Sequence, residues 1–338
     1  MYQLVKSFAF VIFFFNPLSV TSHGDEKHLI RGQSKADTME QCVEPTSIMQ
    51  KEHFKFLYHQ RDKTVIKGVR TKKHSFANCI DCHVSYDNEG EPIPVNSEGQ
   101  FCQTCHIETA VNIDCFSCHA SVPRGKSAIP LDKEVDSSTK WAMNVDVDKC
   151  VEGCSACVDA CVDENGLYGF DRPETDSQWI RKLTIKDIKT EKITTLPMMC
   201  QHCENPPCCD VCPTGASFRR EDGIVMVNQH TCIGCRYCMM ACPFKARSFV
   251  HENLTEQVTN APRGKGCVES CNFCANRIDH GSDTTACEEA CMKEGHQAIS
   301  FGDLSNPNSR VNKAIENKSG RRLRADLALK QRVTYSGF

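Results

Sequence analysis

The sequence predicts an α+β protein in two parts: an irregular N-terminal domain, then a C-terminal domain that doubles a small unit of short strands and helices. A length of 338 residues suggests about two domains. The 25 cysteines are too widely spread for a small disulfide-stapled scaffold, and their odd number means that disulfides alone do not account for them. They fall into two regions with different spacing, which is the main sign of two domains.

Charge and motifs exclude several classes of function. Lysine and arginine number 40 and aspartate and glutamate 43, so the net charge of −3 gives no indication of a nucleic-acid partner. The run Gly264-Lys265-Gly266 has Glu269 in place of the third glycine of a dinucleotide-binding motif. P-loop, Ser/His/Asp and H-E-x-x-H arrangements are absent as well. The sequence therefore predicts no catalytic residues and no nucleotide or flavin cofactor.

The first element, residues 1–22, reads as an export segment. Lys6 precedes an apolar run from Phe8 to Val20, and hydrophilic sequence follows. This pattern predicts a secretory signal, because the run is shorter than the roughly 20 apolar residues that span a bilayer. If the signal is not cleaved, the same segment would serve as an N-terminal anchor. We expect the protein in the periplasm or at the extracytoplasmic face of the cytoplasmic membrane.

The second element, 23–128, contains C-x-x-C-H three times. Two thiols at this spacing attach a haem covalently, and the following histidine ligates its iron. A zinc knuckle or a redox dithiol explains one such motif, but tandem repetition favours three c-type haems. The short polar stretches around the motifs predict a triheme cytochrome c domain without sustained regular structure. The predicted haem residues are Cys79, Cys82, His83, Cys102, Cys105, His106, Cys115, Cys118 and His119.

Each haem iron requires a sixth, distal ligand, and this region offers five candidates for three positions. They are Cys42, Met49, His53, His59 and His74. The sequence does not decide which of them bind.

The third element, 140–338, contains four cysteine quartets. The two middle quartets each end in Cys-Pro, and the second matches the bacterial [4Fe–4S] run. Zinc is a poor alternative, because zinc sites use two pairs separated by a dozen or more residues. The sequence therefore predicts four [4Fe–4S] clusters. The quartets are Cys150, Cys154, Cys157 and Cys161; Cys200, Cys203, Cys208 and Cys212; Cys232, Cys235, Cys238 and Cys242; and Cys271, Cys274, Cys287 and Cys291.

The quartets are expected to exchange their last thiols, since the fourth cysteine of one run ligates the other cluster in two-cluster ferredoxins. Cys242 would then complete the first middle quartet and Cys212 the second. Likewise, Cys291 would complete the first outer quartet and Cys161 the last. Outside the haem motifs and these quartets remain Cys42, Cys209 and Cys267, and the choice between Cys208 and Cys209 as ligand stays open.

Between the middle quartets, two strand-like runs flank a Glu-Asp-Gly turn at 221–223, which predicts a β-hairpin. Short strands, with short helices after each Cys-Pro, fit a doubled ferredoxin-like unit. Gly234 would let the backbone approach a cluster closely. The polar tail beyond Phe301 is expected to pack along this unit and contact a membrane subunit.

The C-terminal domain resembles the four-cluster ferredoxin-like subunits of membrane quinone-linked oxidoreductases. The resemblance rests on Cys200-Gln-His-Cys-Glu-Asn-Pro-Pro-Cys208, Cys232-Ile-Gly-Cys-Arg-Tyr-Cys238, Cys271-Asn-Phe-Cys274-Ala-Asn-Arg and Phe301-Gly-Asp-Leu-Ser-Asn-Pro-Asn-Ser309. Within that family, Cys150-Val-Glu-Gly-Cys154 is most similar to the O subunit of the Dsr membrane complex, which is linked to dissimilatory sulfite reductase. The stretch from Cys42-Val-Glu-Pro-Thr46 through the haem motifs resembles the triheme J subunit, so the chain resembles a fusion of J and O.

The resemblance implies an electron-transfer subunit with mixed His/His, His/Met and His/Cys haem ligation, in which Cys42 is the distal thiolate. Its partners would be a periplasmic sulfur-linked protein, a quinone-reactive integral membrane subunit and other subunits of a Dsr-like complex. The chain departs from the family in lacking a twin-arginine signal and a proline after Cys291. Two alternatives stay open: catalysis on a sulfur compound at the Cys42-ligated haem, and clusters with only a structural role.

Overall fold

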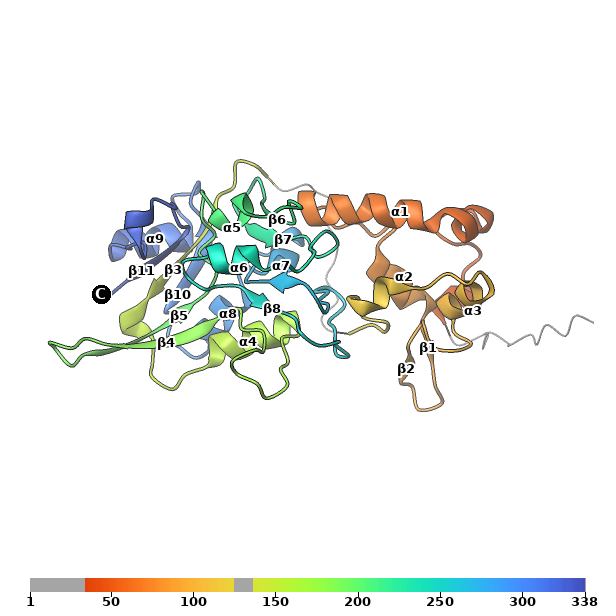
Figure 1. Cartoon of the computed structure of the whole chain (residues 1–338), viewed down its shortest axis with the longest axis horizontal. Helices are drawn as coiled ribbons and strands as arrows, with labels where there is room; N and C mark the ends of the chain where they lie inside the picture. The colour runs from red at the N-terminus through yellow and green to blue at the C-terminus, as the bar shows by residue number, and fades with distance from the viewer. Residues whose placement is uncertain (1–33, 125–135, 338) are drawn as a thin grey trace, which may run out of the picture.

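The computed structural model describes residues 34–124 and 136–337, which form two parts arranged along the long axis of the molecule (Figure 1). The predicted signal at 1–22 lies outside the described residues. The predicted gap between the domains, 129–139, overlaps residues 125–135, which also lie outside them.

The N-terminal part is mainly helical, with one small β-ladder. Its two strands pair antiparallel, with Ser85 opposite Ile93. None of the helices in the described residues is both long and apolar enough to cross a membrane. The elements are η1 (Lys35–Thr38), α1 (Thr46–Lys67), α2 (Phe76–His83), β1 (Ser85–Tyr86), β2 (Pro92–Ile93), α3 (Phe101–Glu108) and η2 (Asp114–Ser117).

Helix α1 corrects the expectation that this part lacks sustained regular structure. It runs for 22 residues, begins after Pro45 and ends at Gly68, whose φ of 65° is the left-handed conformation of a helix C-cap. Exposed apolar residues such as Ile48, Phe54 and Tyr58 lie among charged ones without a continuous stripe. The helix is therefore marked by its ends and not by hydrophobic periodicity.

The C-terminal part contains one three-stranded sheet, three two-stranded ladders and several short helices. Its elements are β3 (Trp141–Asp146), η3 (Val147–Lys149), α4 (Ala156–Asn165), β4 (Arg181–Lys186), β5 (Ile193–Met198), α5 (Pro207–Asp210), β6 (Ser217–Arg219), β7 (Val225–Val227), α6 (Tyr237–Ala241), β8 (Ser248–Phe249), β9 (Val268–Glu269), α7 (Ala275–Asp279), α8 (Ala286–Lys293), β10 (Ile299–Asp303), α9 (Arg310–Asn317), η4 (Ala325–Leu327) and β11 (Val333–Ser336).

The three-stranded sheet has the order β10-β3-β11 and ties the tail to the core of this part. Strand β3 pairs antiparallel with β10 and parallel with β11. Phe301 and Tyr335 are fully buried in it. Because β11 completes this sheet, deleting the tail would damage the fold, and the tail's contact with a membrane subunit stays a prediction.

The hairpin predicted between the middle quartets is confirmed. Strands β6 and β7 pair antiparallel, with Phe218 opposite Met226, and Gly223 takes a φ of 92° in the turn. The expectation of helices after each Cys-Pro was wrong, because α5 and α6 precede the prolines. A residue before proline is pushed out of the helical conformation, and Cys242 is accordingly extended at the end of α6.

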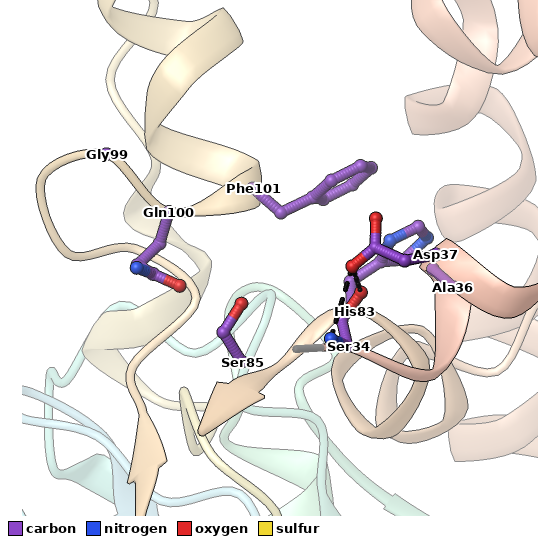
Figure 2. A pocket seen from close by; sticks show the side chains of 8 residues that line it. All are labelled: Ser34, Ala36, Asp37, His83, Ser85, Gly99, Gln100 and Phe101. Atoms are coloured by element: carbon purple, nitrogen blue, oxygen red, sulfur yellow. Dashed lines mark hydrogen bonds between the residues drawn. The ribbon is translucent and has the colours of Figure 1, made fainter. Parts of the chain in front are cut away.

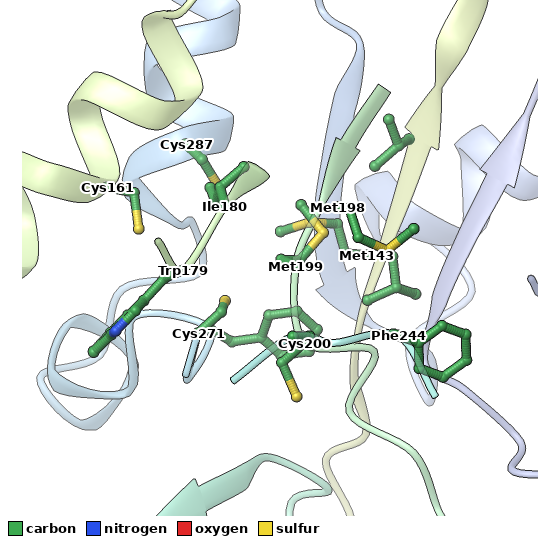
Figure 3. Packing of buried hydrophobic residues seen from close by; sticks show 14 of the residues in the cluster. Met143, Cys161, Trp179, Ile180, Met198, Met199, Cys200, Phe244, Cys271 and Cys287 are labelled. Atoms are coloured by element: carbon green, nitrogen blue, oxygen red, sulfur yellow. The ribbon is translucent and has the colours of Figure 1, made fainter. Parts of the chain in front are cut away.

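Two cysteines of the first outer quartet and two of the last lie on helices that are longer than α5 and α6. Helix α4 carries Cys157 and Cys161, α8 carries Cys287 and Cys291, and both helices continue beyond the last cysteine. With no proline after Cys161 or Cys291, nothing stops the helix at that point. The absent proline therefore lengthens these helices and leaves the cysteines in place. Figure 3 shows Cys161 and Cys287, together with Trp179 and Ile180, among the residues of the buried core.

A buried charge cluster joins the two parts. Arg220 donates to Asp222 and, over 2.8 Å, to Asp279, and Arg70 from the N-terminal part reaches the other oxygen of Asp279 at 3.0 Å. The side chains of Arg220 and Asp279 are completely buried. Arg124 adds a second link, with a backbone hydrogen bond from Thr259 and an ion pair with Glu256 at 2.7 Å.

Candidate cofactor sites

The structure brings the first middle set of thiols together as the exchange predicts. Burial, and then the neighbouring thiols of Cys200, Cys208 and Cys242, raise the pKa of Cys203 to about 12. Burial also raises the pKa of Cys200 to about 12. Cys200 and Cys203 are therefore protonated near neutral pH, and binding iron as thiolates would release their protons.

The structure favours Cys208 over Cys209 as the ligand. Arg247 donates to the Cys208 sulfur at 3.1 Å, and Cys209 donates its S–H to the same sulfur. Together they hold the pKa of Cys208 down at about 6, whereas hydrogen bonding to Cys208 raises that of Cys209. Cys208 is thus the readier thiolate. Arg247 itself carries no sequence signal, and its role was missed.

The second middle set lines a cavity. Its wall includes all four predicted ligands, Cys212, Cys232, Cys235 and Cys238. The other residues of the wall are Thr214, Ala216, Ser217, Ile233, Gly234, Arg236 and Val268. Gly234 has a φ of 70°, and a side chain there would collide with the carbonyl oxygen of Gly266. The spare thiol Cys267 donates to Cys232 and, with backbone N–H groups, lowers the pKa of Cys232 to about 5.

The outer quartets also pair by exchange. Burial raises the pKa of Cys150 to about 12, with Cys157 and Cys291 as neighbouring thiols. Burial raises that of Cys161 well above its ordinary value, with Cys271, Cys274 and Cys287 around it. Each predicted outer set is therefore a group of neighbours from two distant segments of the chain.

Backbone N–H groups near the cysteines are consistent with iron–sulfur clusters at these four sets. The last thiols of three quartets accept backbone N–H groups, at 3.3 Å for Cys212, 3.5 Å for Cys242 and 3.2 Å for Cys291. Such bonds stabilise thiolates and tune cluster potentials. Among the described residues, no group of three or more histidine, cysteine or acidic side chains is arranged to hold a single metal ion. A Cys₄ cubane differs from such a site, because its thiolates hold a cluster of several irons.

His202, between two predicted ligands, was also missed. Its Nδ1 accepts the N–H of Val225 at 3.0 Å, so the proton sits on Nε2, which is buried and has no hydrogen-bond partner among the described residues. Burial lowers the pKa of His202 to about 3, and the ring is neutral. A buried N–H requires an acceptor. The part of the chain that the structure describes supplies none here, whereas a sulfide of a neighbouring cluster would be such an acceptor.

The haem motifs lie on short helical segments of the N-terminal part. Cys79 and Cys82 are three residues apart on α2, which places both thiols on one helical face, with His83 next to them. Cys102 and Cys105 repeat this arrangement on α3. A cavity lies beside His83, as Figure 2 shows, lined by Ser34, Ala36, Asp37, Ser85, Gly99, Gln100 and Phe101.

The N-terminal part leaves much apolar surface for a large apolar group to cover. Among its described residues, the buried apolar cluster is small and consists of Ile80, Val84, Val95 and Val122. Several large apolar side chains are exposed instead, with Ile107 at 59% and Val111 at 53%. The residues in this part therefore fit the covalent haems that the motifs predict, because haem would cover apolar surface that is otherwise exposed to solvent. The exposed set is Met39, Val43, Ile48, Phe54, Tyr58, Ile66, Phe101, Ile107 and Val111.

The structure separates the five distal-ligand candidates. His53 faces His106 with ring centroids 5.9 Å apart, and its Nδ1 donates to the carbonyl of Met49 at 2.9 Å, which leaves Nε2 for iron. Met49 lies one helical turn before it. His74 instead directs its Nε2 to Glu44 at 3.0 Å, an arrangement unsuited to iron ligation through that nitrogen.

The two remaining candidates differ in their surroundings. His59 is exposed on α1. Cys42 lies close to the first haem motif: burial, and then the nearby Cys42 thiol, raise the pKa of Cys79 to about 11.

The third haem motif lies against the C-terminal part. The carbonyl of Cys118 accepts the N–H of Arg263 at 3.1 Å, and Gly264 has no side chain because Cys118 occupies that space. Burial, followed by His230, lowers the pKa of His119 to about 4, so this imidazole is neutral, the form that ligates iron. The third motif thus contacts the segment that carries Cys232 and Cys267.

Comparisons with known proteins agree with the C-terminal part. Residues 191–304 match the family model for a 4Fe-4S dicluster domain. The chain is 40% identical over 230 residues to the Hdr-like menaquinol oxidoreductase iron-sulfur subunit 1 of Archaeoglobus fulgidus, covering 60% of this chain and 86% of that protein. It is 36% identical over 200 residues to the B subunit of the polysulfide reductase of Wolinella succinogenes, covering 57% and 92%.

A third relative is the menaquinone reductase iron-sulfur cluster-binding subunit of Nitratidesulfovibrio vulgaris, which is 34% identical over 230 residues and covered to 88%. The structure has the mixed α+β fold expected of a ferredoxin-like domain. The chain therefore belongs to the family of ferredoxin-like, [4Fe–4S]-binding electron-transfer subunits of oxidoreductase complexes.

Proposed function

We propose that this chain is an exported electron wire, a natural fusion of a triheme cytochrome c domain with a four-cluster ferredoxin-like subunit, as in the J and O subunits of the Dsr complex. It carries three covalent haems and four [4Fe–4S] clusters, and the sixteen quartet cysteines are the cluster ligands. It relays electrons between a periplasmic sulfur-linked protein and a quinone-reactive membrane subunit.

One observation carries this proposal: the two cofactor-bearing parts meet at their cysteines. The Cys267 thiol hydrogen-bonds to Cys232 and also lies near Cys118 of the third haem motif. Haem and cubane each take up and release single electrons when bound. Contact between a haem motif and a cluster quartet supports electron transfer within the chain. The names of relatives that oxidise menaquinol or reduce menaquinone support a quinone-linked membrane partner.

A pulse-radiolysis experiment tests the wire. A pulse that delivers less than one electron per chain should be followed by opposite absorbance changes of haem and cluster, at a rate independent of protein concentration. The Cys235→Ser variant removes one predicted ligand and should abolish this phase, whereas Cys209→Ser should preserve it. A rate proportional to protein concentration would mean that electrons move between molecules, and the proposal would fail.

The position of Cys42 supports thiolate ligation of the first haem. Cys42→Ser is expected to remove one low-spin thiolate-type EPR signal and raise that haem's potential, because thiolate donates charge to iron. All three haems should stay attached, since no C-x-x-C-H motif changes. An unchanged low-spin spectrum would exclude this ligand, and with it the alternative of sulfur chemistry at the Cys42 haem.

A further inference from the structure

The junction between the two parts places two histidines from distant segments next to each other. His119 belongs to the third C-x-x-C-H motif, and His230 stands two residues before Cys232. Their ring centroids are 5.9 Å apart, with an angle of 37° between the planes. We propose that His230 is the distal ligand of the third haem, opposite His119. This inference rests on the proposed function, because it requires the haem.

The hydrogen bonds of His230 prepare one ring nitrogen for iron. The side-chain oxygen of Asn228 accepts the backbone N–H of His230 at 3.1 Å, which identifies this atom as the amide oxygen. The same oxygen lies 3.3 Å from Nδ1, so Nδ1 donates and Nε2 keeps its lone pair. Metal-ligating histidines commonly donate their other N–H to such an oxygen.

Asn228 is itself held firmly. It is 8% exposed, its N–H donates to Ala216 at 2.7 Å, and its carbonyl accepts the N–H groups of Thr231 and Cys232. The orientation of His230 is therefore fixed by the same loop that begins the cluster quartet.

The second haem motif provides an internal parallel. His106 also faces a histidine, His53, at 5.9 Å, and His53 likewise donates through Nδ1 to a carbonyl oxygen. Two of the three motif histidines thus face an imidazole whose Nε2 is left for iron. The sequence singled out His53 but missed His230, because His230 lies outside the haem-binding region.

The contacts around Cys118 fix the distance between these histidines. The Arg263 N–H and the bare Gly264 backbone hold the third motif against the C-terminal part. With His230 on iron, a short stretch of backbone would connect the haem to the Cys232 cluster. One electron lost by the reduced cluster would reduce ferric haem to ferrous along this route, and the reverse transfer would use the same path.

The test measures low-temperature EPR spectra of the ferric haems in the full chain. The number of covalent haems per chain is determined from the absorbance of their pyridine complex. In His230→Ala, one of the three low-spin signals should become high-spin while the haem count stays at three, and added imidazole should restore it. In His230→Met, that haem should stay low-spin with a higher potential, as thioether ligation produces. His251→Ala, an exposed histidine on the same part, is the control and should change nothing.

The outcomes separate the two proposals. The ligand assignment alone would be overturned if all three haems stay attached and low-spin in His230→Ala and if their potentials are unchanged in His230→Met. A wild-type chain without covalent haem would overturn the haem part of the proposed function as well. If His230→Ala fails to fold, the potential measured on His230→Met decides the assignment.

Discussion

Replacing Arg220 with methionine is expected to lower the free energy of unfolding by about 3–5 kcal/mol, the usual cost of removing one partner from a buried ion pair. Arg220 is the shared partner of Asp222 and Asp279, and all three side chains are at most 1% exposed. Without its guanidinium, Asp222 would remain buried without its ion-pair partner, and Asp279 would keep only Arg70. Urea denaturation of the cofactor-loaded chain, followed by circular dichroism, measures the loss.

Arg324→Met is the matched control. Arg324 pairs with Asp326 at 2.9 Å, but both side chains are more than half exposed, so the stability should hardly change. Equal stability of the two variants would mean that the Arg220 cluster does not hold the two parts together.

Replacing Cys208 with serine is expected to remove one whole cluster, about four of the sixteen cluster irons. Serine at the adjacent Cys209 should leave the iron content unchanged, since Cys209 only donates a hydrogen bond to Cys208 and a hydroxyl also donates. Iron analysis of anaerobically purified chains compares the two. Loss of a cluster in Cys209→Ser, with Cys208→Ser intact, would reverse the assignment.

The local signals in the sequence predicted local structure well. The Glu-Asp-Gly turn gave the β6–β7 hairpin, because a glycine with positive φ between two strand-like runs leaves few other conformations. The thiol exchange between quartets matches the neighbours around Cys203 and Cys161, because ligand spacing reflects cluster geometry. Helix α1 was missed because its surface lacks an apolar stripe.

Contacts between distant segments could not be predicted from spacing. Strand β11 pairs with β3 about 190 residues earlier, as Thr334 with Asn144, and nothing in its four residues identifies that partner. Arg247 contacts Cys208, and His230 contacts His119, only because the fold brings these distant segments together. Residues on local motifs could therefore be proposed as ligands from the sequence, while the residues that contact them from distant segments could not.

The most direct measurement is the iron and covalent haem content of the purified full chain. The account predicts three haems and about nineteen irons per chain, three in haem and sixteen in four cubanes. About sixteen irons without covalent haem would contradict the haem domain, and about three irons with bound zinc would contradict the clusters.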